Sequence, residues 1–303
     1  MKYWILLSRL PFLSVVILPY ILGTLLAQRL TGQFSPVVFW LGLLGTILIQ
    51  LCAHYSGEVY DIKEDRLGLS LGRSPFSGGS QVLVKNLIPE SKVKILIRAV
   101  ILLALAIGII LQFYFKTGEW TLLLGASGII CGLFYSKPPL RWVSRGLGEI
   151  FIVYSFGFLA VNAGFYIQVS KFDILAVFIS LPAACAVANI ILINEYPDYP
   201  VDKEAAKRNL LVRLGEEKGA FLYALLVVCA AASFLLALTK GLPLESAFFY
   251  FPVLIAAAIA AFLMLRGAYK NKLLLEKMCA TTILVNLGTS FSCILGLLIS
   301  KTR

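Results

Sequence analysis

Nine apolar runs, each close to the length needed to cross a lipid bilayer, constrain the fold of this chain more than any other feature. They cover residues 10–28, 36–55, 94–114, 119–135, 149–169, 174–195, 217–238, 245–266 and 277–299. A helix of about 20 apolar residues spans the hydrocarbon core and satisfies its own backbone hydrogen bonds there. Because 59% of the 303 residues are hydrophobic and only 14% are charged, the sequence excludes a soluble domain and predicts an all-α polytopic membrane protein.

The distribution of Lys and Arg predicts how the chain is oriented. The N-terminus carries Lys2 and Arg9, and the connections after the second, fourth, sixth and eighth runs are basic. The opposite side holds, of 27 Lys and Arg residues, only Arg29, Lys116, Lys171, Lys240, Lys301 and Arg303. By the positive-inside rule, the N-terminus and the even-numbered connections are expected in the cytoplasm. Topology therefore explains most of the net charge of +11, and no nucleic-acid partner is expected.

Two acidic segments follow apolar runs on this expected cytoplasmic side. Asp61 and Asp65 follow the second run, and Asp198 and Asp202 follow the sixth. Carboxylates four residues apart share one face of a helix and repel each other unless a cation lies between them. Acids at a membrane boundary are costly, which favours a functional role. Mg²⁺ takes oxygen ligands from one or two carboxylates and a substrate phosphate, so we expect these four aspartates to be catalytic Mg²⁺ ligands.

Basic loops accompany both acidic pairs. The connection after the second run contains Arg66 and Arg73, and the one after the sixth contains Lys207 and Arg208. Because this unit occurs twice, we expect a weak internal repeat, with halves 1–145 and 146–303 of a single domain facing one central cavity. The loops are expected to bind an anionic substrate, although contact with anionic membrane lipid is an alternative for some of their charges.

An anionic head group and apolar cavity walls together favour a prenyl diphosphate as substrate. Ionisation of its C–O bond leaves an allylic cation, which an aromatic face stabilises. Tyr135 and Tyr196 lie near the acidic motifs and are candidates for this contact. His54, the single histidine, precedes Glu58 by one helical turn and is a candidate for acceptor contact, with a packing role as the alternative.

Residues 194–215 resemble a known family. Asn194, Asp198 and Asp202 are spaced four apart, and the run Lys-Arg-Asn-Leu-Leu-Val-Arg-Leu-Gly follows at 207–215. With the loops at 73–80 and 135–140, this pattern resembles the UbiA superfamily of intramembrane prenyltransferases over nearly the whole chain. The loops are most similar to those of menaquinone-branch members, which attach a prenyl chain to dihydroxynaphthoate.

The resemblance implies an activity and a set of site residues. The implied reaction is Mg²⁺-dependent transfer of an isoprenyl group to an aromatic, quinone-precursor-like acceptor, with release of diphosphate. Glu58 and Asn194 are implied as metal ligands beside the four aspartates. The expected substrate-binding residues are His54, Arg66, Arg73, Tyr135, Lys137, Arg141, Tyr196, Lys207 and Arg208.

The first motif departs from the family pattern, and other functions stay open. Gly57 and Glu58 stand where family members usually have Asn and Asp, which makes a lipid acceptor such as a glyceryl phosphate an alternative. An ion-coupled secondary transporter is a second alternative, but transporters place their acids near the bilayer midplane. A CDP-alcohol phosphotransferase would have one continuous acidic motif instead of two.

Overall fold

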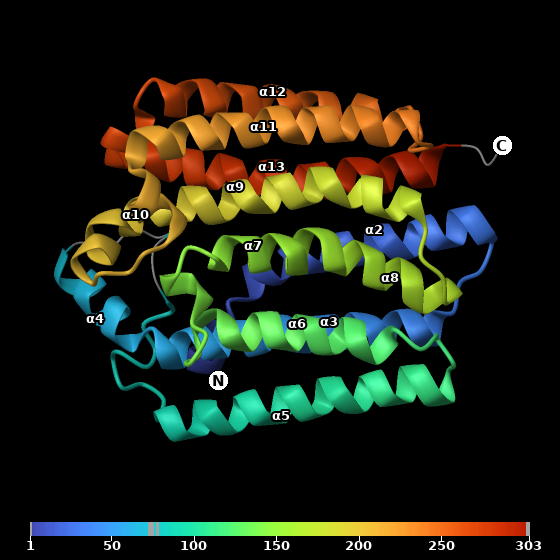
Figure 1. Ribbon diagram of the computed structural model, residues 1–303, viewed down its shortest axis with the longest axis horizontal. Helices are drawn as coiled ribbons and strands as arrows, with labels where there is room; N and C mark the ends of the chain where they lie inside the picture. Colours follow the sequence, from blue (N-terminus) through green and yellow to red (C-terminus); the bar gives the residue numbers. More distant parts are fainter. Residues whose placement is uncertain (1, 72–75, 77–78, 301–303) are drawn as a thin grey trace.

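The computed structural model describes residues 2–71, 76 and 79–300, and these residues are all-helical with no β-strand among them. This confirms the predicted fold class. The long helices lie side by side with nearly parallel axes, and the short helices α4 (Ile62–Leu71) and α10 (Leu210–Leu214) gather at one end of the bundle (Figure 1). The C-terminus lies at the opposite end (Figure 1).

The long helices form nine passes through the bundle. The first combines α1 (Lys2–Ser8), η1 (Leu10–Leu13) and α2 (Ser14–Thr31), and the fifth combines α7 (Gly148–Ile152), the π-helical η4 (Val153–Leu159) and α8 (Ala160–Val169). The others are α3 (Pro36–Tyr60), α5 (Glu90–Ile109) continued by η2 (Ile110–Tyr114), α6 (Thr121–Ser136), α9 (Ile174–Glu204), α11 (Glu216–Thr239), α12 (Glu245–Leu265) and α13 (Lys272–Ile299). Short turns η3 (Trp142–Ser144) and η5 (Ala268–Lys270) lie in two connections.

Eight of these passes are long and apolar enough to cross a membrane. The remaining helix, α6, is apolar but has only 16 residues, or about 24 Å at 1.5 Å per residue. That length is less than the hydrocarbon thickness of about 30 Å. The membrane character of the chain is therefore confirmed, whereas the count of nine spans and the cytoplasmic N-terminus stay predictions.

Helix α9 is much longer than a bilayer requires. Its 31 residues extend over about 46 Å, so its final turns project beyond the hydrocarbon core, about 30 Å thick. Asn194, Asp198 and Asp202 lie in this end, one helical turn apart. The length of α9 therefore carries the second acidic motif out to where charged groups can be hydrated.

The first pass breaks at Arg9, whose φ of 47° ends α1. Polar side chains of α3 bind the backbone around this break. The Gln50 amide donates to the Phe12 carbonyl at 2.9 Å, and His54 Nδ1 lies 3.0 Å from the Ser8 carbonyl oxygen. Since a carbonyl oxygen only accepts, His54 Nδ1 carries the proton in this contact. These bonds fix the N-terminal segment against the half of α3 that ends at the first acidic motif.

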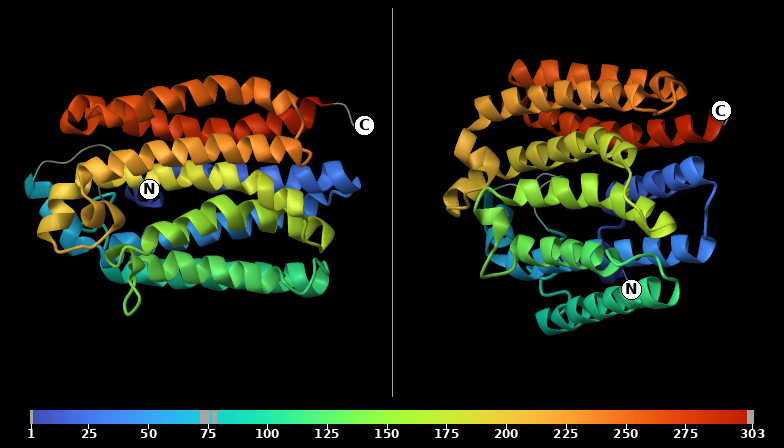
Figure 2. Two further views of the ribbon diagram at one scale, coloured as in Figure 1. Left: turned by 45° about the horizontal axis from the view of Figure 1, so that its top comes forward. Right: turned by 45° about the vertical axis from the view of Figure 1, so that its right-hand side comes forward.

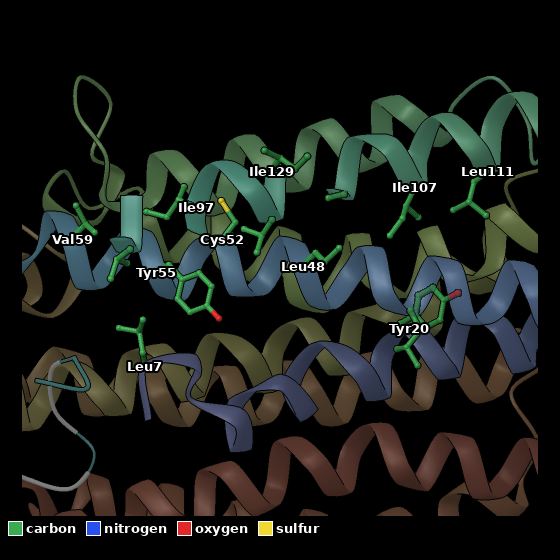
Figure 3. Packing of buried hydrophobic residues seen from close by; sticks show 14 of the residues in the cluster. Leu7, Tyr20, Leu48, Cys52, Tyr55, Val59, Ile97, Ile107, Leu111 and Ile129 are labelled. Atoms are coloured by element: carbon green, nitrogen blue, oxygen red, sulfur yellow. The ribbon is translucent and has the colours of Figure 1, made fainter. Parts of the chain in front are cut away.

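Packing divides the bundle into two main sides joined by the first and fifth passes. In both views of Figure 2, α5 lies toward one edge of the bundle and α12 toward the other. Figure 3 shows the apolar cluster along α3, in which Cys52 and Leu48 lie near Ile97, Ile107 and Ile129. Where α2 crosses α8, Gly23 and Gly164 lie directly against backbone atoms of the other helix, an approach that only small residues permit.

Candidate active site

A cavity of about 490 Å³ opens at the end of the bundle that carries α4 and α10. Both acidic motifs line it, through Asp61 and Asp65 of the first motif and Asn194, Asp198 and Asp202 of the second. Deeper in, its walls are apolar and include Val15, Phe156, Val187 and Ile190. The structure thus places two motifs about 137 positions apart around one space, which we call the polar cavity.

The first motif crosses the junction between α3 and α4. Asp61 follows the last residue of α3, yet the Asp61 amide donates to the Gly57 carbonyl and the Asp65 amide to the Asp61 carbonyl, both at 2.9 Å. This helical spacing keeps Asp61 and Asp65 on the cavity side. Asp61 Oδ2 accepts a bond from the Ser136 hydroxyl at 2.6 Å, and Asp61 Oδ1 lies 3.3 Å from Arg141 Nη2.

The second motif is held by residues of its own loop. Asp202 Oδ1 accepts a hydrogen bond from Lys207 Nζ at 3.2 Å, and Asp202 Oδ2 accepts one from the side-chain Nδ2 of Asn209 at 2.7 Å. The loop itself is anchored by acids of α7 and α9, because Glu149 accepts from the Leu210 backbone amide at 2.9 Å and Glu195 from the Leu211 backbone amide at 3.0 Å. Lys207 is thereby fixed within the polar cavity.

The electrostatic state of the polar cavity follows from burial and charge. The pKa of Asp65 is raised to about 6. Burial is the largest cause and the nearby Glu58 charge adds to it, while the hydrogen bond from the Gly79 amide acts in the opposite direction. Burial also raises the pKa of Asp61, against the opposing charges of Lys207 and Arg141. For Lys207, burial alone would lower the pKa, but Asp202 and Asp61 raise it overall. Lys207 is therefore a permanent cation between the two motifs.

The donor set of the cavity fits Mg²⁺ bound together with an anionic substrate. Asn194 Oδ1 is buried and has no hydrogen-bond partner, which leaves a neutral oxygen ligand available. Within residues 2–71, 76 and 79–300, no three His, Cys, Asp or Glu side chains are grouped closely enough to hold an ion alone. Because Mg²⁺ typically takes one or two carboxylates and completes its shell with water and phosphate, each aspartate pair suits this mode of binding.

Glu58 does not line the polar cavity. Its side chain is 1% exposed and lies 2.7 Å from Arg9 Nη2. The Ser80 amide also donates to Glu58 Oε1, and the Ser80 hydroxyl donates to Glu58 Oε2 at 2.8 Å. The structure thus holds Glu58 against Arg9 and Ser80, which both line the polar cavity, and its role as a metal ligand stays a prediction.

The expected substrate-binding residues divide into two groups. The polar cavity is lined by three of them, His54, Tyr135 and Lys207. It is not lined by the second group, which consists of Arg66, Lys137, Arg141, Tyr196 and Arg208. Arg73 lies outside the described residues.

Each residue of the second group has another environment. Arg66 and Arg208 are exposed to solvent. The Tyr196 hydroxyl donates to the Glu216 carbonyl at 2.6 Å, facing α11. Arg141 binds Glu64 at 2.5 Å besides Asp61, and Lys137 Nζ lies 5.9 Å from the centre of the Phe134 ring.

Sequence reasoning missed several residues of the cavity. Arg9, Ser136, Glu195 and Asn209 line it but were not among the expected site residues. Arg9 carried a usable signal, because a single cation between apolar residues at a membrane boundary is costly and marks a functional or paired group. Ser136, Glu195 and Asn209 lie within or beside motifs that the sequence had already indicated. Only the direction of their side chains in the fold distinguishes them from neighbours that do not line the cavity.

The fold and the cavity define an integral membrane protein whose cavity is polar near the acidic motifs and apolar farther in. A comparison with family models identifies the class: the model of the UbiA prenyltransferase family matches residues 16–280. The chain therefore belongs to the UbiA prenyltransferase family and is a membrane-embedded prenyltransferase.

Curated relatives refine the comparison. The chain is 29% identical to the 2-carboxy-1,4-naphthoquinone phytyltransferase of Synechocystis over 75% of its own length and 71% of that protein. It is also 29% identical to the 1,4-dihydroxy-2-naphthoate octaprenyltransferase of Bacillus subtilis, over 76% and 70% of the two chains. Both relatives transfer a prenyl group to a naphthoate-type aromatic acceptor, as their names state, which agrees with the predicted resemblance to the menaquinone branch.

Solved structures share the fold. A structure of digeranylgeranylglyceryl phosphate synthase superposes with a TM-score of 0.67 at 16% identity, covering 98% of each chain. A UbiA homologue from Archaeoglobus fulgidus, bound to GPP and Mg²⁺, superposes with a TM-score of 0.61 at 21% identity, covering 97% of this chain and 99% of that one. At these identities the likeness establishes the fold alone.

Proposed function

We propose that this protein transfers an isoprenyl group from a prenyl diphosphate to a bicyclic aromatic quinone precursor, with Mg²⁺ as cofactor and diphosphate as the second product. The observation that carries the proposal is the meeting of both aspartate pairs and the Lys207 ammonium in one cavity with apolar inner walls. A prenyl diphosphate has the matching charge distribution. The basic connections favour a cytoplasmic position for this cavity.

The aspartates and Asn194 are the residues that would hold Mg²⁺. Asp61 and Asp65 come from the first half, 1–145, and Asn194, Asp198 and Asp202 from the second half, 146–303, and all five line the cavity. When bound, the metal supplies positive charge to the diphosphate oxygens and so assists their departure. The described part of the chain has no preformed group of three acids that could hold the metal alone. In the proposed complex, phosphate oxygens of the substrate would complete the coordination shell of Mg²⁺.

The protein's own residues contribute charge, orientation and exclusion of water. The donor's C1–O bond breaks, and its electron pair leaves with the diphosphate, whose growing charge Lys207 stabilises at close range. The Tyr135 ring, which lines the cavity, offers its face to the allylic cation. An acceptor ring carbon then supplies the electron pair for the new C–C bond, and that carbon loses its proton. The apolar wall around Phe156 and Ile190 limits attack by water.

The names of the relatives support the proposed acceptor class. Both relatives described above are named for naphthoate-type acceptors, and the chain is similar to each over about three quarters of its length. A glyceryl phosphate acceptor, as in the synthase that shares the fold, is the alternative that the assay must separate from a naphthoate.

A direct assay tests the proposal. Purified protein in lipid nanodiscs is incubated with Mg²⁺, labelled geranylgeranyl diphosphate and one of three acceptors: 1,4-dihydroxy-2-naphthoate, 4-hydroxybenzoate or geranylgeranylglyceryl phosphate. We expect prenylated naphthoate and stoichiometric diphosphate, both abolished by EDTA and restored by Mg²⁺. Transfer to the glyceryl phosphate alone, or product formation that EDTA leaves unchanged, would refute the proposed acceptor or the proposed cofactor, respectively.

A further inference from the structure

A second cavity of about 90 Å³ lies beside the polar cavity, and we call it the apolar cavity. Its walls come from α2, α3, α5, α6 and the fifth pass. Along α3, the polar cavity is lined at Gln50, Ala53 and His54, and the apolar cavity at Thr46 and Ile49. The apolar cavity is therefore the next space along α3 toward the opposite membrane face.

One aromatic residue is common to the two spaces. Phe156 lines both cavities and lies in the π-helical turn η4. A π-helical turn widens a helix locally and changes the direction of its side chains, and such turns are common at functional sites. A molecule bound in the polar cavity that extends past Phe156 would enter the apolar cavity.

The apolar cavity has no polar group available for a ligand. Among its lining residues in the described chain, four carry a hydroxyl, and each hydroxyl already has a partner. Tyr20 donates to the Phe39 carbonyl, Thr46 to the Gly42 carbonyl and Ser155 to the Phe151 carbonyl, while Thr121 pairs with Thr117, each at 2.8 Å. A space with satisfied walls does not hold ordered water well and favours small apolar groups.

Glycines on two facing helices leave this space open. A Cβ atom added at Gly125 of α6 would meet no heavy atom within 4 Å, and one added at Gly45 of α3 would meet only Ile107 Cγ2, at 3.4 Å. Both glycines line the apolar cavity and have no positive φ. Their lack of a side chain is therefore not required by backbone conformation, and a larger residue at Gly125 would occupy the cavity instead of displacing a neighbour.

We infer that the apolar cavity binds the distal isoprenyl unit of the donor and that Gly125 and Gly45 determine how long a donor the enzyme accepts. This inference rests on the proposed function, because it needs a prenyl diphosphate with its head among the aspartates. The shared Phe156 marks the point where the chain passes from the reaction site into its specificity site.

Filling the cavity tests the inference. In Gly125→Leu, the catalytic efficiency kcat/KM is measured with dimethylallyl, geranyl, farnesyl and geranylgeranyl diphosphate. We expect a fall of at least about tenfold for the longest donor that the wild type uses, since one methylene in an apolar pocket already changes discrimination about tenfold or more. The shortest accepted donor should change less than about twofold. The matched control is Leu123→Phe, which adds volume on the same helix at a position 56% exposed and should leave the length profile unchanged.

The outcomes separate this inference from the proposed function. If the wild type turns over no prenyl diphosphate with any acceptor, the proposed function fails. If turnover is normal and Gly125→Leu keeps the wild-type length profile, or loses efficiency equally for all donors, the inference is wrong. A farnesyl diphosphate with a diazirine at its terminal carbon gives a reading that does not depend on a variant: it should cross-link to segments 42–49 and 121–128, and cross-links confined to α11 to α13 would overturn the assignment.

Discussion

Arg9 and Glu58, 49 positions apart, form a salt bridge of 2.7 Å between the N-terminal segment and the end of α3. Glu58 is almost completely buried, and it also accepts two bonds from Ser80. The neighbouring Gly79 amide donates to Asp65 at 2.9 Å. The acid that replaces the usual first aspartate of the motif therefore joins three segments around the polar cavity, and the aspartates behind it remain directed into that cavity.

We predict that Arg9→Met destabilises the protein by about 2–3 kcal/mol. Removing one partner of a buried pair leaves an uncompensated charge, although the cost is below that of a fully buried pair because Arg9 is 29% exposed. Unfolding in a denaturing-detergent titration measures the change. The double variant Arg9→Met/Glu58→Gln should recover at least half of the loss, and additive effects of the two single variants would show that the pair contributes no coupling.

We predict that Asp61→Asn and Asp198→Asn each lower turnover by more than about a hundredfold without changing the unfolding transition. Loss of a residue behind a metal ligand typically costs about 10- to 100-fold, so loss of a ligand oxygen charge should cost more. Radiolabelled product formation and the unfolding midpoint are measured on the same preparation. Wild-type turnover in either variant would remove that aspartate from the proposed metal site.

We predict that Lys207→Met reduces kcat by about 100- to 1000-fold, the range found when a single preorganised charge-stabilising donor is removed. Lys207 lies in the polar cavity, 3.2 Å from Asp202. The matched control is Arg208→Met, because Arg208 is the next residue and is exposed outside the cavity. We expect nearly normal turnover in the control. Equal losses in the two variants would mean that the loop contributes through its overall charge and not through one positioned cation.

We predict that the Mg²⁺ requirement depends on pH below about 7. The pKa of Asp65 is raised to about 6, so its carboxylate is mainly protonated below this pH, and metal binding must then displace a proton. The Mg²⁺ concentration for half-maximal activity should therefore rise by up to about tenfold per pH unit as the pH falls below 6. It should stay constant above about 7. In Asp65→Asn, any residual activity should lose this dependence; an unchanged pH profile in that variant would assign the titration to another group.

The membrane helices were predictable because each is defined by neighbours in the sequence. The apolar run at 174–195 predicted the core of α9, but the helix continues to Glu204 through Pro197 and Pro200. Those prolines lie in a helix whose end is held by Lys207, Asn209 and the loop at α10, and a local pattern does not contain such tertiary support. The extension is what brings Asp202 into the polar cavity.

Local sequence patterns do not indicate which of the basic residues line the polar cavity. Lys207 and Arg208 are adjacent in the sequence, and both were expected to bind substrate, yet only Lys207 lines the polar cavity. Arg9 belonged to the topology signal alone, although it faces the same cavity. The direction of a side chain depends on how its segment is rotated and packed against others, which for Arg9 means against a helix 49 positions away.

The sequence by itself determined the helical membrane fold, the location of the two acidic motifs and their common side, because hydrogen bonding within a helix and burial in lipid depend on continuous runs of residues. Only the tertiary structure decided that both motifs share one cavity, that Glu58 binds Arg9 and Ser80, and that an apolar cavity lies beyond Phe156. These relationships depend on helix rotation and on contacts between segments far apart in the chain, and packing of the whole bundle sets both.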